Sequence, residues 1–209
     1  MAIDPLLPYG EVLETTVRIA TWNVWSRFGP WQQRQVRLLE TLQNVDADIV
    51  CLQEAWKVDD QTQADLFAAE LGMHHEHRGE LVYQGVVSGQ AILSRWPIVE
   101  CEGRELDGYG EGSGGGAVFA RVDGPRGPID LVSLILDWRL DLGHVRRRRL
   151  QDVCGGASGL SDPFNPLFLC GDFNAPPDAD ELRALVGLAP VHHPRMVFYD
   201  AVAMAAAGD

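Results

Sequence analysis

The chain has 209 residues and a mass of 23.0 kDa, a length that suits one domain with a substantial core. Apolar residues make up 46% of it and charged residues 22%, which excludes an intrinsically disordered chain. Its net charge of −13, from 30 acidic and 17 basic residues, disfavours general binding to duplex DNA, because such binding needs basic surface.

The apolar runs are of strand length, and none approaches the roughly 20 residues that span a bilayer. The N-terminal residues include acids and prolines where a secretory signal needs a basic start and an apolar centre. We therefore expect a cytoplasmic protein without a membrane span. The four cysteines show no close pairing, so we expect reduced, mostly buried thiols.

The first part of the chain alternates strands with helices. Residues 16–22 are rich in β-branched side chains and predict a strand. An amphipathic helix is expected over 31–45, and the apolar run 48–53 predicts a buried central strand. A second helix is expected over 60–71, with Gly72 as its stop.

The rest of the chain is richer in strands. They are predicted, between turns marked by Gly and Pro, over 81–87, 89–96, 117–122, 129–136 and 166–173. Helices are predicted over 143–153 and 180–187, the latter capped by Asp178. Because strands outnumber helices, we expect an α/β fold, with packed sheets inside and helices outside, in a single domain over 1–209.

Polar residues follow three of the apolar runs. They are Trp22-Asn23, Gln53-Glu54 and the tetrapeptide Gly-Asp-Phe-Asn over 171–174. Carboxylates and carboxamides at strand ends, spread over about 150 residues, are what a divalent-cation phosphoesterase needs to build one site from several loops.

Six motifs then occur in a fixed order along the chain. They are TWNV (21–24), LQEAW (52–56), AILSRWPI (91–98), SLILDWRL (133–140), GDFNAPPDADEL (171–182) and YDAV (199–202). In this order and at these separations, the set resembles the endonuclease/exonuclease/phosphatase superfamily. The resemblance implies a four-layer sandwich, in which two mainly antiparallel sheets face each other and helices lie outside.

The resemblance also implies roles for four residues. Glu54 matches the ligand of the catalytic cation, which is Mg²⁺, with Mn²⁺ as a substitute. Asn23 matches a residue that orients the carboxylates and the phosphate. Asp172 would deprotonate the attacking water, and Asn174 would bind phosphoryl oxygens, on one face of a strand. Each residue also has an ordinary alternative, as a solvated or turn residue at a strand end.

Two positions depart from the family pattern. Ile135 stands where the family has a histidine that donates to the phosphate, and the C-terminal Ser-Asp-His triplet does not occur. His192 and His193 are the only late histidines, and we interpret them as surface loop residues. Without the family's C-terminal strands, one sheet edge would be unpaired, which predicts a homodimer, a segment swap or marginal stability.

Basic and aromatic groups leave alternatives open. Arg146 to Arg149 fall on a predicted helix, either as a solvated, salt-bridged face or as a means of phosphate steering. Trp25, Phe28 and Trp31 near Asn23 could form an aromatic rim for an apolar or stacking substrate, although core packing is the commoner fate of such residues.

The sequence therefore predicts a Mg²⁺-dependent phosphodiesterase or phosphatase that acts by attack of an activated water. Loss of the donor at Ile135 and of the C-terminal Asp-His pair would impair it. Its acidic charge favours a phosphorylated small molecule or a lipid headgroup over duplex DNA. The alternative is a catalytically inactive family member that binds a ligand or a protein.

Overall fold

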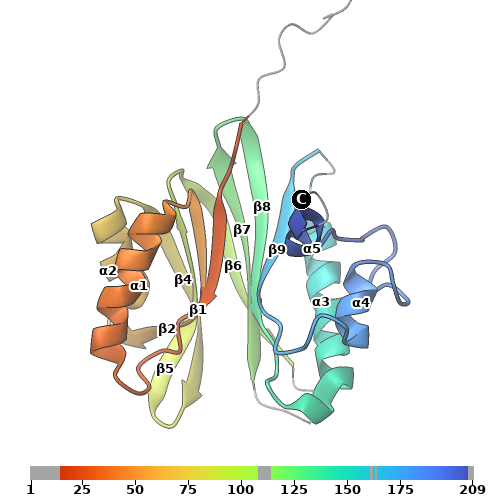
Figure 1. Cartoon of the computed structure of the whole chain (residues 1–209), viewed down its shortest axis with the longest axis horizontal. Helices are drawn as coiled ribbons and strands as arrows, with labels where there is room; N and C mark the ends of the chain where they lie inside the picture. The colour runs from red at the N-terminus through yellow and green to blue at the C-terminus, as the bar shows by residue number, and fades with distance from the viewer. Residues whose placement is uncertain (1–14, 108–113, 161, 163, 207–209) are drawn as a thin grey trace, which may run out of the picture.

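Two β-sheets lie face to face, and helices cover the outer side of each (Figure 1). The computed structural model describes residues 15–107, 114–160, 162 and 164–206. Most strand pairs are antiparallel. The predicted α/β sandwich of two mainly antiparallel sheets with outer helices is thereby confirmed.

The first sheet has the strand order β1-β2-β5-β4, with the short β3 paired to β2. The bounds are β1 (Ile19–Asn23), β2 (Ile49–Val58), β3 (Gln61–Thr62), β4 (His74–Tyr83) and β5 (Val86–Ser94). Helices α1 (Trp31–Val45) and α2 (Gln63–Leu71) cover its outer face (Figure 1). Because β1 and β2 run parallel, their carboxyl ends lie at the same end of the sheet.

The second sheet has the order β6-β7-β8-β9. The bounds are β6 (Ile98–Leu106), β7 (Gly115–Gly124), β8 (Gly127–Ile135) and β9 (Leu167–Asp172). Its outer face is covered by α3 (Gly143–Leu160) and α4 (Asp180–Leu185). A 3₁₀ turn, η1 (Leu140–Leu142), precedes α3, and α5 (Ala201–Ala206) follows α4. β8 and β9 are again parallel, so Ile135 and Asp172 lie side by side where both strands end.

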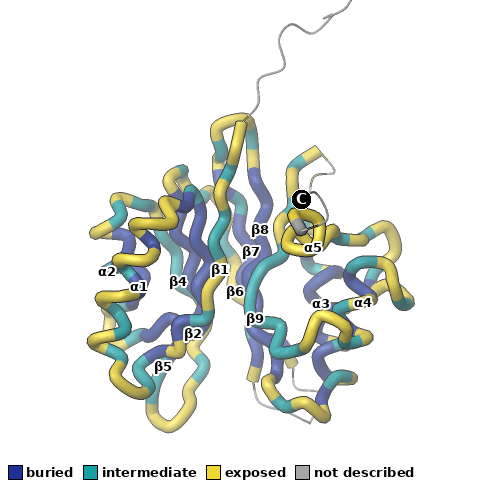
Figure 2. The backbone as a smooth tube through the Cα atoms, viewed as in Figure 1, coloured by how far each residue is buried: buried dark blue, intermediate teal, exposed yellow. Residues whose placement is uncertain are grey.

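Three groups of buried side chains hold the layers together. One lies between the first sheet and its helices, one between the second sheet and its helices, and one between the two sheets. The run from Ile49 to Leu52 is at most 1% exposed, as predicted for a central strand. Figure 2 shows the inner strands buried, whereas β1 and β9 are only partly covered. The polar ends of these two edge strands can therefore meet solvent.

One strand prediction was wrong and one strand was missed. The segment 81–87 is not one strand but the end of β4, a turn and the start of β5, and the turn residues Gln84 and Gly85 have φ angles of 49° and 77°. Two consecutive residues with positive φ form the two-residue turn that suits the twist of a hairpin. Strand β6 was not predicted at all, because most of its residues are exposed at the sheet edge and charged side chains interrupt its apolar ones.

Helix boundaries also differ from the predictions. α2 begins at Gln63, because Thr62 caps it: the Thr62 hydroxyl accepts from the Asp65 amide, and the Asp65 carboxylate accepts from the Thr62 amide. α4 is capped by Ala179 rather than by Asp178. Within the described residues, no helix is both long and apolar enough to cross a membrane.

Candidate active site

Polar residues from both sheets meet where β1, β2 and β9 end. Asn23 is the last residue of β1 and lies opposite Gln53 of β2, and Asp172 is the last residue of β9. Both parallel pairs end at the same end of the sandwich, the lower end in Figure 1. All four sequence-predicted residues are thereby brought together, since Asn23 contacts Glu54 and Asp172, and Asn174 contacts Asp172.

The side chain of Asn23 joins the two carboxylates. Its Nδ2 donates to Oε1 of Glu54 at 2.7 Å and to Oδ2 of Asp172 at 2.8 Å. A carboxamide nitrogen has two hydrogens, so both are used. The two carboxylate oxygens therefore lie less than about 6 Å apart, a distance that one hydrated cation and a phosphate can span.

Glu54 sits in a β-bulge of β2, where the pairing register shifts between Leu52 and Ala55. Its φ of 56° is in the left-handed region, which costs a non-glycine residue about 1–3 kcal/mol. Neighbouring groups hold this conformation: the Ser26 amide donates to the Glu54 carbonyl at 3.0 Å, and His77 Nε2 lies 3.2 Å from the Ala55 carbonyl oxygen. The bulge thus directs the Glu54 side chain to Asn23.

The Ala55 carbonyl oxygen can only accept, so His77 must donate a proton from Nε2 to it. Burial lowers the pKa of His77 more than the hydrogen bond to Ala55 raises it. The ring is therefore neutral at pH 7 and serves as a hydrogen-bond donor to the bulge.

Asp172 and Asn174 are related by a turn and not by strand alternation. β9 ends at Asp172, and Asn174 has a φ of 49°, so the prediction that both lie on one strand face was wrong. Instead, the Asn174 amide donates to Oδ1 of Asp172 at 3.0 Å. The Asn174 side chain donates to the Leu136 carbonyl at 2.9 Å, which fixes it at the end of β8. The Asp172 carboxylate is thus held by Asn23 on one oxygen and by Asn174 on the other.

The loop that follows Asn23 is held by one arginine of α1, which the sequence analysis did not identify. The Arg34 guanidinium donates to the carbonyls of Val24, Trp25, Ser26 and Phe28 at 2.9–3.2 Å. Trp25 and Ser26 have φ angles of 55° and 39°. Two consecutive strained residues persist only where surrounding contacts determine them, and such strain is typical of functional sites.

A buried polar network connects the two sheets behind Glu54. Gln53, 1% exposed, donates from Nε2 to the Ser133 hydroxyl at 3.0 Å, and Ser133 donates to Oε1 of Gln90 at 3.1 Å. Thr21 of β1 donates to Oε1 of Gln53 at 3.4 Å. The network links β1, β2 and β5 to β8, and so fixes the spacing of the sheets that carry Glu54 and Asp172.

The four-arginine segment of α3 is mostly not a solvated face. Arg146 and Arg149 are 3% and 0% exposed, and the Nε of Arg146 donates to Oε1 of Glu181 at 2.7 Å. The solvated-face prediction therefore holds for Arg148 but not for these two residues. His192 is also buried, at 9% exposure, and its Nε2 donates to the Glu181 carbonyl at 2.7 Å. Its assignment to the surface was therefore wrong.

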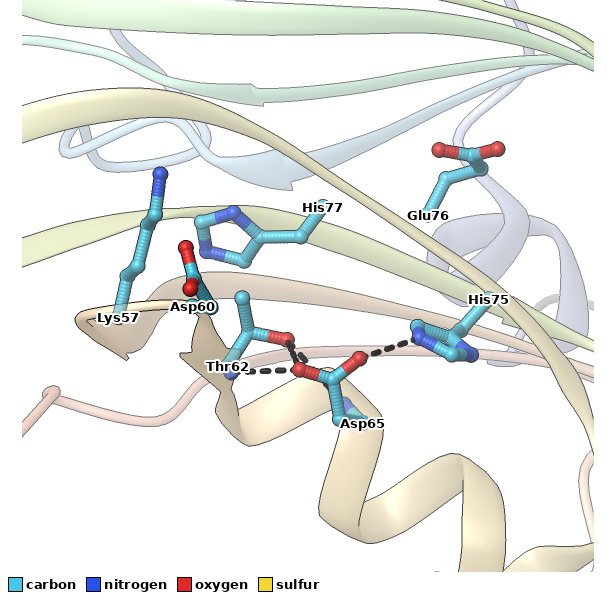
Figure 3. A pocket seen from close by; sticks show the side chains of 7 residues that line it. All are labelled: Lys57, Asp60, Thr62, Asp65, His75, Glu76 and His77. Carbon is cyan, nitrogen blue, oxygen red and sulfur yellow. Dashed lines mark hydrogen bonds and ion pairs between the residues drawn. The ribbon is translucent and has the colours of Figure 1, made fainter.

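A separate charged hollow of about 280 Å³ lies beside the bulge of β2 (Figure 3). It is lined by Lys57, Asp60, Thr62, Asp65, His75, Glu76 and His77. Figure 3 shows its central carboxylate, Asp65, bonded to Thr62 and to His75, the latter at 2.7 Å. Burial opposes ionisation of Asp65, but the hydrogen bonds from Thr62 and His75 lower its pKa overall. This carboxylate takes part in the cap at the start of α2 and is not part of the Asn23 site.

The residues of the Asn23 site fit a hard, largely hydrated cation. They offer carboxylate oxygens, which Mg²⁺ prefers, and Mg²⁺ is commonly held by one or two carboxylates while keeping several waters. The described residues contain no group of three or more His, Cys, Asp or Glu side chains that could hold a metal ion. A small donor set of Glu54 and Asp172 suits Mg²⁺ or Mn²⁺ better than zinc, which takes several nitrogen or sulfur ligands.

The sequence matches the Endonuclease/Exonuclease/phosphatase family over residues 20–203. Its fold is similar to that of the human Nocturnin catalytic domain with bound sulfate, at 20% identity and a TM-score of 0.70, over 81% of this chain and 68% of that one. A mannosyl-6-phosphatase from Bacteroides thetaiotaomicron is similar at 20% identity and a TM-score of 0.69, over 82% and 70% of the chains.

The 2′,3′-cyclic phosphatase ANGEL2, in complex with adenosine-2′,3′-vanadate, is similar at 16% identity and a TM-score of 0.66. That match covers 82% of this chain and 57% of ANGEL2. No curated protein matches the sequence closely.

Proposed function

Because the chain belongs to the endonuclease/exonuclease/phosphatase family, we propose that it hydrolyses a phosphate ester with the help of a divalent cation. The observation that carries the proposal is the pair of hydrogen bonds from Asn23 to Glu54 and Asp172. These bonds hold two carboxylates from different sheets at the separation that a cation and its phosphate require.

The proposed roles are based on the hydrogen bonds and on the family resemblance. Glu54 would hold the cation, Mg²⁺ or Mn²⁺, which when bound stabilises the charge that develops on the phosphoryl oxygens. Asp172 accepts the proton of the attacking water, and Asn23 and Asn174 keep its carboxylate oriented. Asn174 uses one side-chain hydrogen on the Leu136 carbonyl, which leaves the other for a phosphoryl oxygen. Asn23 has none left, so it positions the carboxylates and does not bind phosphate.

The substrate class that we propose is a small phosphate ester or a phosphorylated headgroup. The net charge of −13 opposes a long polyanion such as duplex DNA, because phosphate neutralisation by basic residues supplies most of that affinity. Two proteins of similar fold are a sugar phosphatase and a 2′,3′-cyclic phosphatase by name, which is consistent with small esters.

The test is hydrolysis of generic phosphomonoesters and phosphodiesters with Mg²⁺ or Mn²⁺. We expect Glu54→Gln and Asp172→Asn each to lower kcat/KM by about 10²–10⁴, and chelation of the cation to abolish activity. Glu70→Gln and Asp178→Asn, which remove exposed carboxylates elsewhere, are the matched controls and should have no effect. Activity that survives in both site variants would overturn the proposal.

One observation favours a second candidate, a binding protein without turnover. Ile135 ends β8 beside Asp172, is 9% exposed and cannot donate a hydrogen bond to phosphate. Loss of one such donor typically lowers the rate by about 10²–10³. Binding of a phosphorylated ligand with no cation-dependent hydrolysis of any ester would support this candidate instead.

A further inference from the structure

Three aromatic side chains, two exposed and one half-buried, contact one another beside the Asn23 site. We call Trp25, Phe28 and Tyr83 the aromatic ledge. Their ring centroids are 6.1 Å apart for Trp25 and Phe28 and 5.9 Å apart for Phe28 and Tyr83. Trp25 is 53% exposed and Tyr83 61% exposed. Phe28 between them is half-buried. Large aromatic side chains are usually covered in a folded domain, so two exposed rings joined by a third indicate a binding surface.

The ledge is attached to the catalytic residues by the backbone. The Trp25 amide donates to Oδ1 of Asn23 at 2.9 Å, next to the bonds from Asn23 to the two carboxylates. Tyr83 precedes the turn of the β4–β5 hairpin, which lies at the end of the sheet where β2 also ends. The ledge and the phosphate site are therefore two parts of one rim.

The loop is built to present Trp25 outward. Arg34 binds four loop carbonyls and also places its guanidinium 5.0 Å from the centre of the Trp25 ring. Gly29 lies close to the same ring, so that a Cβ atom at this position would be only 3.2 Å from it. By contrast, Trp31 packs edge-on against Trp56 at 5.9 Å and is half-buried, so core packing explains Trp31 but not Trp25.

We propose that the aromatic ledge binds a planar ring on the substrate, with Trp25 as the stacking plate, so that the preferred substrates are nucleotide-like phosphate esters. The inference rests on the proposed function, because it assigns the non-phosphate part of the same substrate. A flat ring suits the ledge better than an acyl chain, because one face of the Trp25 ring is supported by Arg34 and the ring can stack on a planar group. Stacking of this kind does not need a deep apolar groove.

The test compares two ligands that differ only in the ring. Adenosine 5′-monophosphate and ribose 5-phosphate share the sugar and the phosphate, so the ratio of their dissociation constants, measured calorimetrically with Ca²⁺, isolates the base. Stacking of one base contributes about 1–3 kcal/mol, so wild type should bind the nucleotide about 5- to 150-fold more tightly than the sugar phosphate. Trp25→Ala should bring the ratio close to one by weakening the binding of the nucleotide.

Three further variants test the assignment. Trp25→Phe keeps a ring and should retain most of the preference for the nucleotide. Tyr83→Ala, on the β4–β5 hairpin, should lower this preference without altering the Arg34 loop. Phe164→Ala removes an aromatic side chain that is 91% exposed, before the start of β9 and so at the opposite end of that strand from Asp172, and should change nothing.

Every outcome bears on the inference. Equal affinities in wild type, no binding of either ligand, or a ratio unaffected by Trp25→Ala would overturn it. Tighter binding of a short-chain phospholipid than of the nucleotide, lost in Trp25→Ala, would overturn the choice of a planar ring. Hydrolysis of esters without any preference for the base overturns the inference alone, whereas ring-dependent binding without hydrolysis of any ester overturns only the proposed function.

Discussion

Asn23 and Asp172 are 149 positions apart in the sequence, yet Nδ2 of Asn23 lies 2.8 Å from Oδ2 of Asp172. The same nitrogen also holds Glu54. The amide group therefore stands between two carboxylates that would repel each other if they were in direct contact. A neutral donor at this position lets the site keep its geometry with or without a cation. The absence of a charge on Asn23 is therefore important for the site.

Asn23→Asp should couple stability to divalent cations. The variant places a third carboxylate within hydrogen-bond distance of two others, so without a cation it should lower the free energy of unfolding by about 1–3 kcal/mol. Added Mg²⁺ should recover part of that loss, and so raise the melting temperature more in the variant than in wild type. Calorimetry with and without Mg²⁺ checks this. Asn44→Asp, at an exposed position of α1, is the control, and equal shifts in both variants would contradict the prediction.

His77→Ala should weaken cation binding with little loss of turnover. His77 donates to the carbonyl of Ala55, so it supports the bulge that orients Glu54 without touching Glu54 itself. Removing a group that orients a ligand typically lowers metal affinity about 10–100-fold. We expect a higher Mg²⁺ concentration for half-maximal activity and a kcat near wild type at saturation.

The control for this variant is His74→Ala, which removes an exposed histidine from the same strand and should leave the Mg²⁺ dependence unchanged. A His77→Ala enzyme that loses kcat at saturating Mg²⁺ would show that the histidine acts on the substrate and not through the bulge.

The sequence indicated the main site residues because each follows an apolar run directly. Asn23 and Asp172 end strands, and parallel pairing then fixes which ends meet. Such a pattern depends only on the order of residues along a short segment of the chain. The Arg34 contacts could not be predicted in this way, since they depend on a loop with positive φ at Trp25 and Ser26, which residue preferences disfavour.

Buried polar residues account for a further group of errors. Arg146, Arg149 and His192 are polar types that usually lie at the surface, and only tertiary partners make their burial favourable. β6 was missed for the opposite reason, since an edge strand with exposed polar side chains lacks the hydrophobic alternation that marks a strand.

Arg146→Ala should be strongly destabilising. Arg146 and Glu181 form an ion pair whose side chains are 4% and 7% exposed, so removal of one leaves a buried charge and costs about 3–5 kcal/mol. The double variant Arg146→Met, Glu181→Leu should be markedly more stable than Arg146→Ala, because neither charge remains. Arg148→Ala, at an exposed position of the same helix, should change stability by less than about 0.5 kcal/mol. Urea unfolding measures all three.

His192 should make the fold less stable in mild acid. Burial lowers the pKa of His192 more than its hydrogen bond to the Glu181 carbonyl raises it. The unfolded chain therefore binds more protons than the folded chain below about pH 6.5, so stability falls as pH falls. His192→Gln removes this contribution. The loss of unfolding free energy between pH 7.5 and 5.5 should be smaller in the variant, and an equal loss would contradict the assignment.

β9 should promote self-association. Among the described residues it pairs only with β8, so its other edge presents unpaired backbone groups, and Phe168 on it is 39% exposed. We expect light scattering to show a concentration-dependent dimer. Phe168→Lys should shift the protein to monomer, because a charged side chain on an edge strand opposes pairing with another chain. Val36→Lys, on exposed α1, is the control. A wild-type monomer at all concentrations would mean that the β9 edge is protected without a partner.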